Sequence, residues 1–205
     1  ECLVGSEMCI RDRTDKIHDG GVWADQGVIA GCAGGLFDNI AEAADILRGK
    51  FTGSGAFSFD VYPTSVPVSL ELMKLGATAA LLESGAIIKP SFCGPCFGAG
   101  DTPANNAFSI RHSTRNFPNR EGSKLQNGQI ASVALMDARS IAATAANKGR
   151  LTPATEYAGT YSNPKYYFDG TIYKNRVFDS KGVADPSVEI QFGPNIKDLS
   201  LIHIS

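Results

Sequence analysis

Short apolar runs alternate along the chain with segments that carry apolar residues at helical spacing. Residues 27–31 form the first apolar run, which has the length and composition of a buried strand. Leu36, Ile40, Ala44 and Leu47 then recur at helical spacing, and a glycine follows to end the helix. Strands that alternate with helices in this way form parallel sheets covered by helices. The pattern therefore predicts an α/β fold with a mostly parallel sheet.

The same alternation continues along the next hundred or so residues. Further strands are predicted at 57–61, 86–88, 107–112 and 130–136. Two further helical segments begin at Ser65 and after Asp137, and the first of them pauses near Gly76. Residues 14–150 therefore have the size and the pattern of one domain.

The pattern changes after residue 150, where four prolines punctuate the chain. Residues 165–168 and 171–173 flank the dipeptide Asp169-Gly170, an arrangement typical of a β-hairpin with an Asp-Gly turn. Residues 151–198 are accordingly predicted to be a connector that contains a β-hairpin and leads to another domain.

The two ends of the chain, residues 1–13 and 199–205, follow no period and join no neighbouring pattern. Both are interpreted as non-native flanks and are set aside from the fold. This removes Cys2 and Cys9 from the argument and leaves three cysteines. An odd cysteine count without an intact signal peptide disfavours a secreted, disulfide-bonded protein.

The net charge of −2 argues against a nucleic-acid partner or a membrane surface. No apolar run has the length needed to span a bilayer. Cysteines that are few and clustered indicate a reducing compartment, so a cytoplasmic location is expected.

Cys32, Cys93 and Cys96 are the candidate metal ligands. The loop Cys93-Gly94-Pro95-Cys96 can wrap two thiolates around one metal centre, and Cys32 can complete a set of three. Three interpretations are open: a four-iron cluster with one iron that lacks a protein ligand, a zinc site with His112 as fourth ligand, and a thiol–disulfide motif of Cys93 and Cys96. The last leaves Cys32 unexplained.

These cysteines and a set of polar residues each follow a predicted strand. Cys32 comes directly after the first strand, Cys93 and Cys96 follow residues 86–88, and Thr114, Arg115 and Arg120 follow residues 107–112. Ligand sites of open parallel sheets lie at the carboxyl ends of the strands. The three elements are therefore expected at the same edge of the sheet, where the two guanidinium groups are suited to bind carboxylates.

Three motifs carry a resemblance to a known family. They are residues 92–98 (FCGPCFG), residues 113–120 (STRNFPNR) and Gly31-Cys32. In order and spacing they resemble the iron–sulfur domain of the aconitase and isopropylmalate isomerase superfamily of hydro-lyases, most closely its bacterial aconitase-like hydratases. The resemblance covers nearly all of residues 27–198.

The resemblance implies a three-layer α/β/α domain of Rossmann-like type and a 4Fe-4S cluster. It implies that Cys32, Cys93 and Cys96 each bind one iron, and that the fourth iron acts as a Lewis acid on a hydroxy-polycarboxylic acid such as citrate or isocitrate. Arg115, Arg120 and Thr114 are similar to the residues that bind substrate in the family. The family's general base is a serine on a swivelling domain after the connector, and further acid–base residues come from N-terminal domains. The resemblance therefore implies that this chain is a fragment that is inactive alone.

The chain departs from the family pattern beside the cysteines. Ala33 and Gly34 stand where the family usually has Thr and Asn, and Thr114 stands where it usually has Asn. Changes next to a metal site tune its chemistry, so the identity of the substrate stays open. A non-catalytic iron–sulfur or zinc module is the alternative function. An electron-transfer cluster usually has every iron bound by protein, so the lack of a fourth cysteine favours the hydro-lyase.

Overall fold

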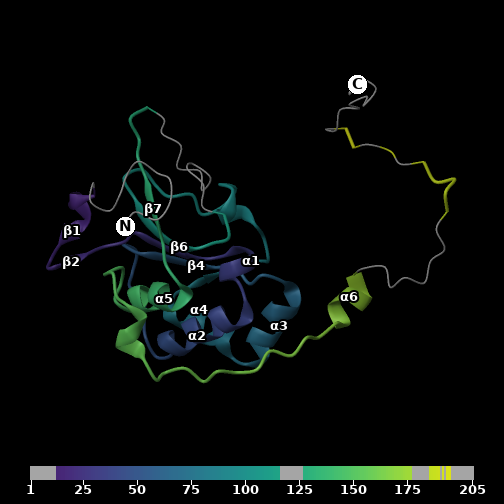
Figure 1. Cartoon of the computed structure of the whole chain (residues 1–205), viewed down its shortest axis with the longest axis horizontal. Helices are drawn as coiled ribbons and strands as arrows, with labels where there is room; N and C mark the ends of the chain where they lie inside the picture. Colours follow the sequence, from purple (N-terminus) through teal and green to yellow (C-terminus); the bar gives the residue numbers. More distant parts are fainter. Residues whose placement is uncertain (1–12, 116–126, 177–184, 190, 192, 195–205) are drawn as a thin grey trace. The chain divides into compact units, whose positions relative to one another are not determined.

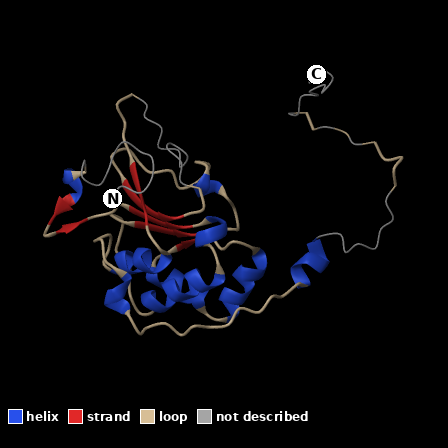
Figure 2. Cartoon of the chain, in the orientation of Figure 1, coloured by secondary structure: helices blue, strands red, loops and turns tan. Residues whose placement is uncertain are grey.

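A five-stranded parallel sheet forms the centre of the protein (Figure 2). The computed structural model describes residues 13–115, 127–176, 185–189, 191 and 193–194. The strand order is β5-β4-β3-β6-β7. The strands are β3 (Gln26–Ile29), β4 (Ser58–Val61), β5 (Ile87–Ile88), β6 (Phe108–His112) and β7 (Ser132–Leu135). Each lies within a predicted strand or one residue from it, and the predicted α/β class with a parallel sheet is confirmed.

Four helices cover one face of this sheet (Figure 1). They are α2 (Phe37–Leu47), α3 (Val66–Lys74), α4 (Ala77–Ser84) and α5 (Ala138–Ala146). The predicted pause at Gly76 separates α3 from α4, and this residue has a φ of 76°, a conformation that glycine adopts without strain. A short helix that was not predicted, α1 (Gly31–Gly34), follows β3.

Asp137 begins helix α5, as the sequence predicts. Its Oδ1 atom accepts hydrogen bonds from the backbone N–H groups of Arg139 at 3.0 Å and Ser140 at 3.1 Å. Burial raises the pKa of this carboxyl, but the hydrogen bonds from Ser140 and Arg139 outweigh burial and hold it below its ordinary value. The ionised carboxylate therefore satisfies two N–H groups that have no partner inside the helix.

We expect Asp137→Ala to lower the free energy of unfolding by about 0.5–2 kcal/mol, measured by urea denaturation. Asp137→Asn is the matched control, because asparagine caps helices about as well as aspartate. The folded state lowers the pKa of Asp137 below its value in the unfolded chain. The difference in the free energy of unfolding between wild type and Asp137→Ala is therefore complete at pH values above the unfolded pKa, and it shrinks as the pH falls through the folded pKa. An equal loss in both variants would contradict a capping role.

The two faces of the sheet differ in chemistry. A Cβ atom placed on Gly27 would meet Phe59 of β4 and Ile141 of α5, so these residues face the helices, where the main apolar core lies. The strand register pairs Val28 with Asp60 on one side and with Arg111 on the other. Because neighbouring residues in register share a face, Asp60 and Arg111 lie on the face opposite the helices.

This second face is covered by the segment that follows β5. The segment contains a short 3-10 helix, η3 (Gly94–Cys96), and reaches the sheet through hydrogen bonds from Arg111 to Pro95 and from Tyr62 to Asp101. Val28, Ala30 and Tyr62 form a small apolar cluster of their own on this side. The sheet is thus covered on both faces, with helices on one and the cysteine-bearing segment on the other.

The described N-terminal segment packs against the starts of β6 and β7. It consists of η2 (Thr14–Lys16) and an antiparallel pair, β1 (Ile17–His18) and β2 (Gly21–Val22). Arg13 is buried and donates hydrogen bonds to Ser132 Oγ at 2.6 Å and to the Asn106 carbonyl oxygen at 2.7 Å. The last residue of the predicted flank therefore takes part in packing. The rest of both predicted flanks lies outside the described residues.

The first compact unit extends to Gly170, beyond the domain end predicted near residue 150. Tyr157, Tyr161 and Tyr166 pack against the main core, and the Tyr166 ring lies 5.3 Å from that of Phe37. Asp169 pairs with Lys74 at 3.2 Å. The first part of the predicted connector thus belongs to this unit, while its continuation to a further domain stays a prediction.

The predicted β-hairpin around Asp169-Gly170 is wrong. Residues 165–169 have no regular secondary structure, and Thr171–Arg176 form a helix, α6. An isolated two-stranded hairpin is only marginally stable, and the tyrosine and aspartate contacts to α2 and α3 hold the first half in another conformation. Helix α6 opens the second unit, Thr171–Ser205, where Asp185 Oδ1 accepts a hydrogen bond from the Ser187 N–H at 2.9 Å.

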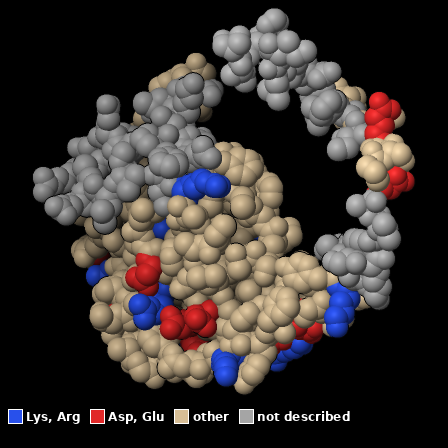
Figure 3. All heavy atoms as spheres, turned by 45° about the vertical axis from the view of Figure 1, so that its right-hand side comes forward, with Lys and Arg blue, Asp and Glu red and all other residues tan. Residues whose placement is uncertain are grey.

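On the face shown in Figure 3, described Lys and Arg side chains are interspersed with Asp and Glu, and neither sign forms a continuous patch there. This agrees with the small net charge of −2. None of the described helices is long and apolar enough to cross a membrane.

Candidate functional site

The carboxyl ends of β3, β5 and β6 bring the predicted site elements together. Cys32 lies in α1, directly after β3, and Cys93 and Cys96 bracket η3, after β5. A Cβ atom placed on Gly31 would stand 2.7 Å from Cys96 Sγ and 2.8 Å from the Thr114 hydroxyl oxygen. Three segments far apart in the sequence therefore meet at Gly31.

Cys32 and Cys93 line the same cavity, which has a volume of about 320 Å³. Its other lining residues are Gly31, Pro63, Thr64, Ser91 and Phe92. Both thiols are exposed, whereas Cys96 is buried, and none of the three forms a disulfide. Two exposed thiols at one opening and a third, buried thiol beside Gly31 thus lie near the same edge of the sheet.

Gly31 is the residue on which this arrangement depends. Its φ of 75° lies in the left-handed region that glycine adopts without strain. Any side chain there would also meet the Thr114 backbone nitrogen, which stands 3.2 Å from the position of a Cβ atom. Glycine is therefore required both by the backbone conformation and by the close approach of the cysteine loop.

The turn that carries Cys32 is fixed by hydrogen bonds. The Ala33 N–H donates to the Thr114 hydroxyl at 2.9 Å, and the Asn39 amide donates to the Ala33 carbonyl at 2.8 Å. A Cβ atom on Gly34 would stand only 2.0 Å from the His112 carbonyl oxygen. Ala33 and Gly34, which differ from the family pattern, thus lie in a turn that packs tightly against the end of β6. The Thr114 hydroxyl helps to hold this turn in place.

The described residues include no group of three His, Cys, Asp or Glu side chains placed to bind a single metal ion. A zinc site made by the three cysteines and His112 needs such a group, so the structure does not support that alternative. In a four-iron cluster each cysteine binds a different iron, so the sulfurs do not have to meet at one ion. A donor set of two thiols at this opening and a third beside Gly31 fits the cluster.

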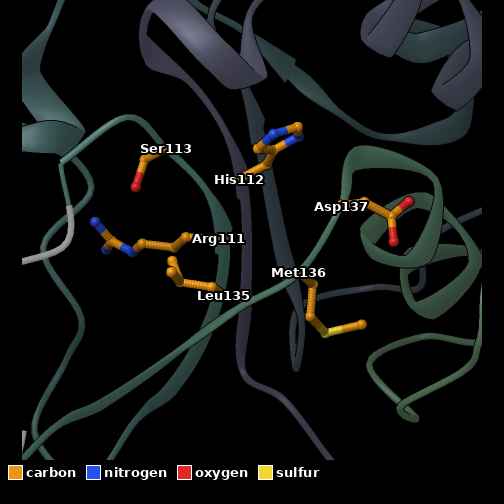
Figure 4. A pocket seen from close by; sticks show the side chains of 6 residues that line it. All are labelled: Arg111, His112, Ser113, Leu135, Met136 and Asp137. Carbon is orange, nitrogen blue, oxygen red and sulfur yellow. The ribbon is translucent and has the colours of Figure 1, made fainter. Parts of the chain in front are cut away.

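His112 lies elsewhere, in a second cavity of about 290 Å³ lined by Arg111, His112, Ser113, Leu135, Met136 and Asp137 (Figure 4). Arg111 and His112 point to opposite sides of β6. Burial lowers the pKa of His112, and the negative charge of Asp137 opposes this shift. Its Nδ1 atom has no hydrogen-bond partner among the described residues. A packed, neutral histidine is therefore the best description.

Arg115 is described and exposed, at the end of the segment that follows β6. Arg120, the second predicted substrate residue, lies outside the described residues. The structure thus places Thr114 beside Gly31 and Arg115 next to it in the chain, and the roles of Arg115 and Arg120 stay predictions.

A cluster of polar residues beneath the cysteine loop was not anticipated from the sequence. Lys89 Nζ lies 3.6 Å from Asp60 Oδ1 and 3.6 Å from Asp101 Oδ1, and the Tyr62 hydroxyl donates to the Asp101 carboxylate. Burial, with the nearby charge of Asp101, raises the pKa of Asp60 to about 6. Burial also raises the pKa of Tyr62.

The signal for this cluster was present in the strands. Asp60 and Arg111 each interrupt a strand that a parallel sheet would bury on both faces, and such strands usually read as continuous apolar runs. A charged residue in such a strand indicates that polar groups cover one face of the sheet.

Comparison with known proteins agrees with this arrangement. Residues 6–143 match the Aconitase family (aconitate hydratase). The chain is 35% identical over 132 residues to the 3-isopropylmalate dehydratase large subunit of Nitratidesulfovibrio vulgaris, an alignment that covers 64% of this chain and 31% of that protein. It is 32% identical over 136 residues to the 2,3-dimethylmalate dehydratase large subunit of Eubacterium barkeri, covering 66% of this chain and 31% of that protein.

The chain spans about a third of the length of these relatives. The family match begins at residue 6, within the predicted N-terminal flank, and it ends at residue 143, within helix α5. It therefore includes the cysteine-bearing segments and all five strands of the parallel sheet. Since more than half of the sequence matches, this chain belongs to the aconitase family.

Proposed function

We propose that the complete protein is a hydro-lyase, which adds water to or removes it from a small hydroxy acid with the help of a 4Fe-4S cluster. The observation that carries this proposal is the meeting of Cys32, Cys93 and Cys96 around Gly31 at the edge of a parallel sheet. The names of the relatives support it, because they are dehydratases.

When bound, the cluster supplies a Lewis-acidic iron for the substrate oxygen that leaves as water. Cys32, Cys93 and Cys96 would hold the cluster, and Gly31 keeps side-chain atoms out of the space beside Cys96. Arg115, with Arg120, would bind a substrate carboxylate through the paired N–H groups of a guanidinium. Thr114 would hold the Cys32 turn next to that carboxylate.

The substrate proposed is a substituted malate, which is a hydroxy dicarboxylic acid. Two relatives are named for 3-isopropylmalate and 2,3-dimethylmalate, and both names describe malates with apolar substituents. Citrate and isocitrate, which the sequence resemblance suggested, are the alternative. They carry one more carboxylate and would need a further cation in the complete site.

The partner proposed is a second polypeptide or domain that supplies the catalytic base. The relatives are named as large subunits, and this chain spans only about a third of their length. Neither an N-terminal domain nor a swivelling domain with the base serine is contained in the described fold. A cytoplasmic location remains part of the proposal.

The experiment is anaerobic reconstitution of the complete protein, followed by iron, sulfide and zinc analysis and by hydration assays with malates and citrate. Iron with sulfide and turnover of a malate would support the proposal. Zinc without sulfide would overturn the cluster, and a stable cluster without turnover of any hydroxy acid would indicate a non-catalytic iron–sulfur module.

Arg115→Lys in the complete protein should weaken binding of the substrate carboxylate by roughly ten- to a hundredfold. Lysine keeps the charge but lacks the planar pair of donors that a carboxylate accepts. Affinity is measured by isothermal titration, together with iron content. Arg48→Lys, which changes an exposed arginine at the end of α2, is the control. Equal affinities in the two variants would remove Arg115 from the substrate site.

A further inference from the structure

Arg111 lies on β6, an inner strand of the sheet, on the face that carries the cysteine loop. Its side chain is buried, with only 1% of the residue exposed. A guanidinium is a costly group to bury, so its hydrogen bonds indicate what the fold uses it for. Nη1 donates to the Pro95 carbonyl oxygen at 3.2 Å, and Nη2 donates to the Asp101 carbonyl oxygen.

These two carbonyls lie in and after the cysteine loop. Pro95 directly precedes Cys96, and Asp101 lies five residues after Cys96, past the end of η3. One rigid, planar group therefore joins the tip of the loop to its end.

The Arg111 guanidinium is itself held in place by side chains of β3 and β6. Nε donates to Ser109 Oγ at 2.9 Å, and Nη2 donates to Gln26 Oε1 at 3.0 Å. Ser109 in turn donates to Gln26 Oε1 at 2.8 Å. The support thus comes from two neighbouring strands, β3 and β6, whose positions are fixed by sheet hydrogen bonds.

The carboxylate of Asp101 gives the loop a second attachment. It accepts a hydrogen bond from the Tyr62 hydroxyl and lies 3.6 Å from Lys89 Nζ. Tyr62 and Lys89 follow β4 and β5, so the end of the loop is tied to both.

Strand β6 also holds the other cysteine-bearing element. The Ala30 N–H donates to the His112 carbonyl oxygen at 2.9 Å, and the Ala33 N–H donates to the Thr114 hydroxyl at 2.9 Å. Arg111 therefore belongs to a strand that contacts both the Cys32 turn and the Cys93–Cys96 loop.

We propose that Arg111 is a positioning residue for the iron–sulfur cluster: by bridging the Pro95 and Asp101 carbonyls it sets the place of Cys93 and Cys96 relative to Cys32. This inference rests on the proposed function, because it concerns the cluster that the three cysteines would hold. Arginine is required because lysine has a single ammonium that cannot span two carbonyls in a fixed plane.

The test compares Arg111→Lys with wild type in the complete, reconstituted protein. We expect the variant to fold and to bind iron and sulfide, but to lose iron to a chelator about ten- to a hundredfold faster, as loss of a group that orients metal ligands typically does. The electron paramagnetic resonance spectrum of the cluster after one-electron reduction, which makes it paramagnetic, should broaden, because the loop now holds its cysteines in several positions. Arg48→Lys is the matched control and should behave as wild type.

The possible results separate the positioning role of Arg111 from the proposed function. Wild-type protein without iron and sulfide would overturn the proposed function together with this inference. A wild-type cluster with unchanged iron loss and spectrum in Arg111→Lys would overturn the positioning role alone. If Arg111→Lys does not fold, Ser109→Ala takes its place, because it removes the hydroxyl that accepts the hydrogen bond from Arg111 Nε. Faster iron loss at an unchanged melting temperature supports the positioning role of Arg111, and a wild-type rate overturns it.

Discussion

Gly31→Ala should prevent the protein from holding its cluster while leaving most of the fold intact. The new Cβ atom would stand 2.7 Å from Cys96 Sγ and 2.8 Å from the Thr114 hydroxyl oxygen, closer than real Cβ atoms approach their neighbours. The turn or the cysteine loop must move, and either movement displaces a sulfur ligand. We expect at least about a tenfold loss of bound iron after reconstitution. Iron and sulfide analysis measures it.

Gly76→Ala is the control that isolates this effect. Gly76 has a φ of 76°, against 75° at Gly31, but a Cβ atom there meets nothing within 4 Å. Both variants therefore carry a backbone strain of about 1–2 kcal/mol, and only Gly31→Ala also intrudes on the cysteines. If the two variants held equal iron, the close approach at Gly31 would have no role in the site.

Cys93→Ser should abolish cluster binding altogether. A serine hydroxyl is a harder and less acidic donor than a thiol, and it replaces a thiolate poorly at iron. Cys93 is exposed at the cavity that it shares with Cys32, so the substitution should cost little stability. Absorbance in the visible range and sulfide content would report the loss, and circular dichroism would report the fold.

His112→Asn separates the cluster from the zinc alternative. His112 lines a different cavity from Cys32 and Cys93, so its replacement should leave iron and sulfide at the wild-type level. A different result would favour zinc bound by the histidine: wild-type protein that contains no sulfide, with metal lost from both Cys93→Ser and His112→Asn.

The sheet and its helices could be predicted because their signals are local. Asp137 caps α5 with its own carboxylate, and Gly76 separates α3 from α4 by its own conformation. The apolar positions of α2 follow a helical period because one side of that helix is buried. Each of these features is encoded within a few residues, so no knowledge of the tertiary fold was needed.

The features that were missed depend on tertiary packing. The Asp169-Gly170 dipeptide is a good hairpin turn, but the chain around it is held by contacts of Tyr166 with Phe37 and of Asp169 with Lys74. The burial of Arg13 depends on acceptors near the starts of two strands far away in the sequence. Such partners cannot be read from the residues beside them.

The candidate site could be predicted from the sequence only in part. The order of the strands along the chain was enough to predict that Cys32, Cys93 and Cys96 lie at one edge of the sheet. The role of Arg111 was not predictable, because it depends on which carbonyls come to lie over β6. The sequence predicted the candidate ligands, and the structure was needed to find which residues hold them in place.

The strand order also has a consequence for the timing of assembly. Along the chain, β3 is the first of the five strands of the parallel sheet, and it lies at the centre of that sheet, between β4 and β6. Cys32 and Cys96 can therefore meet only after two crossovers have folded, and pairing of this non-local kind is slow. During that interval the thiols are unprotected against oxidation. The proposed cluster would therefore load only after the sheet has formed, and the three thiols would have to stay reduced until then.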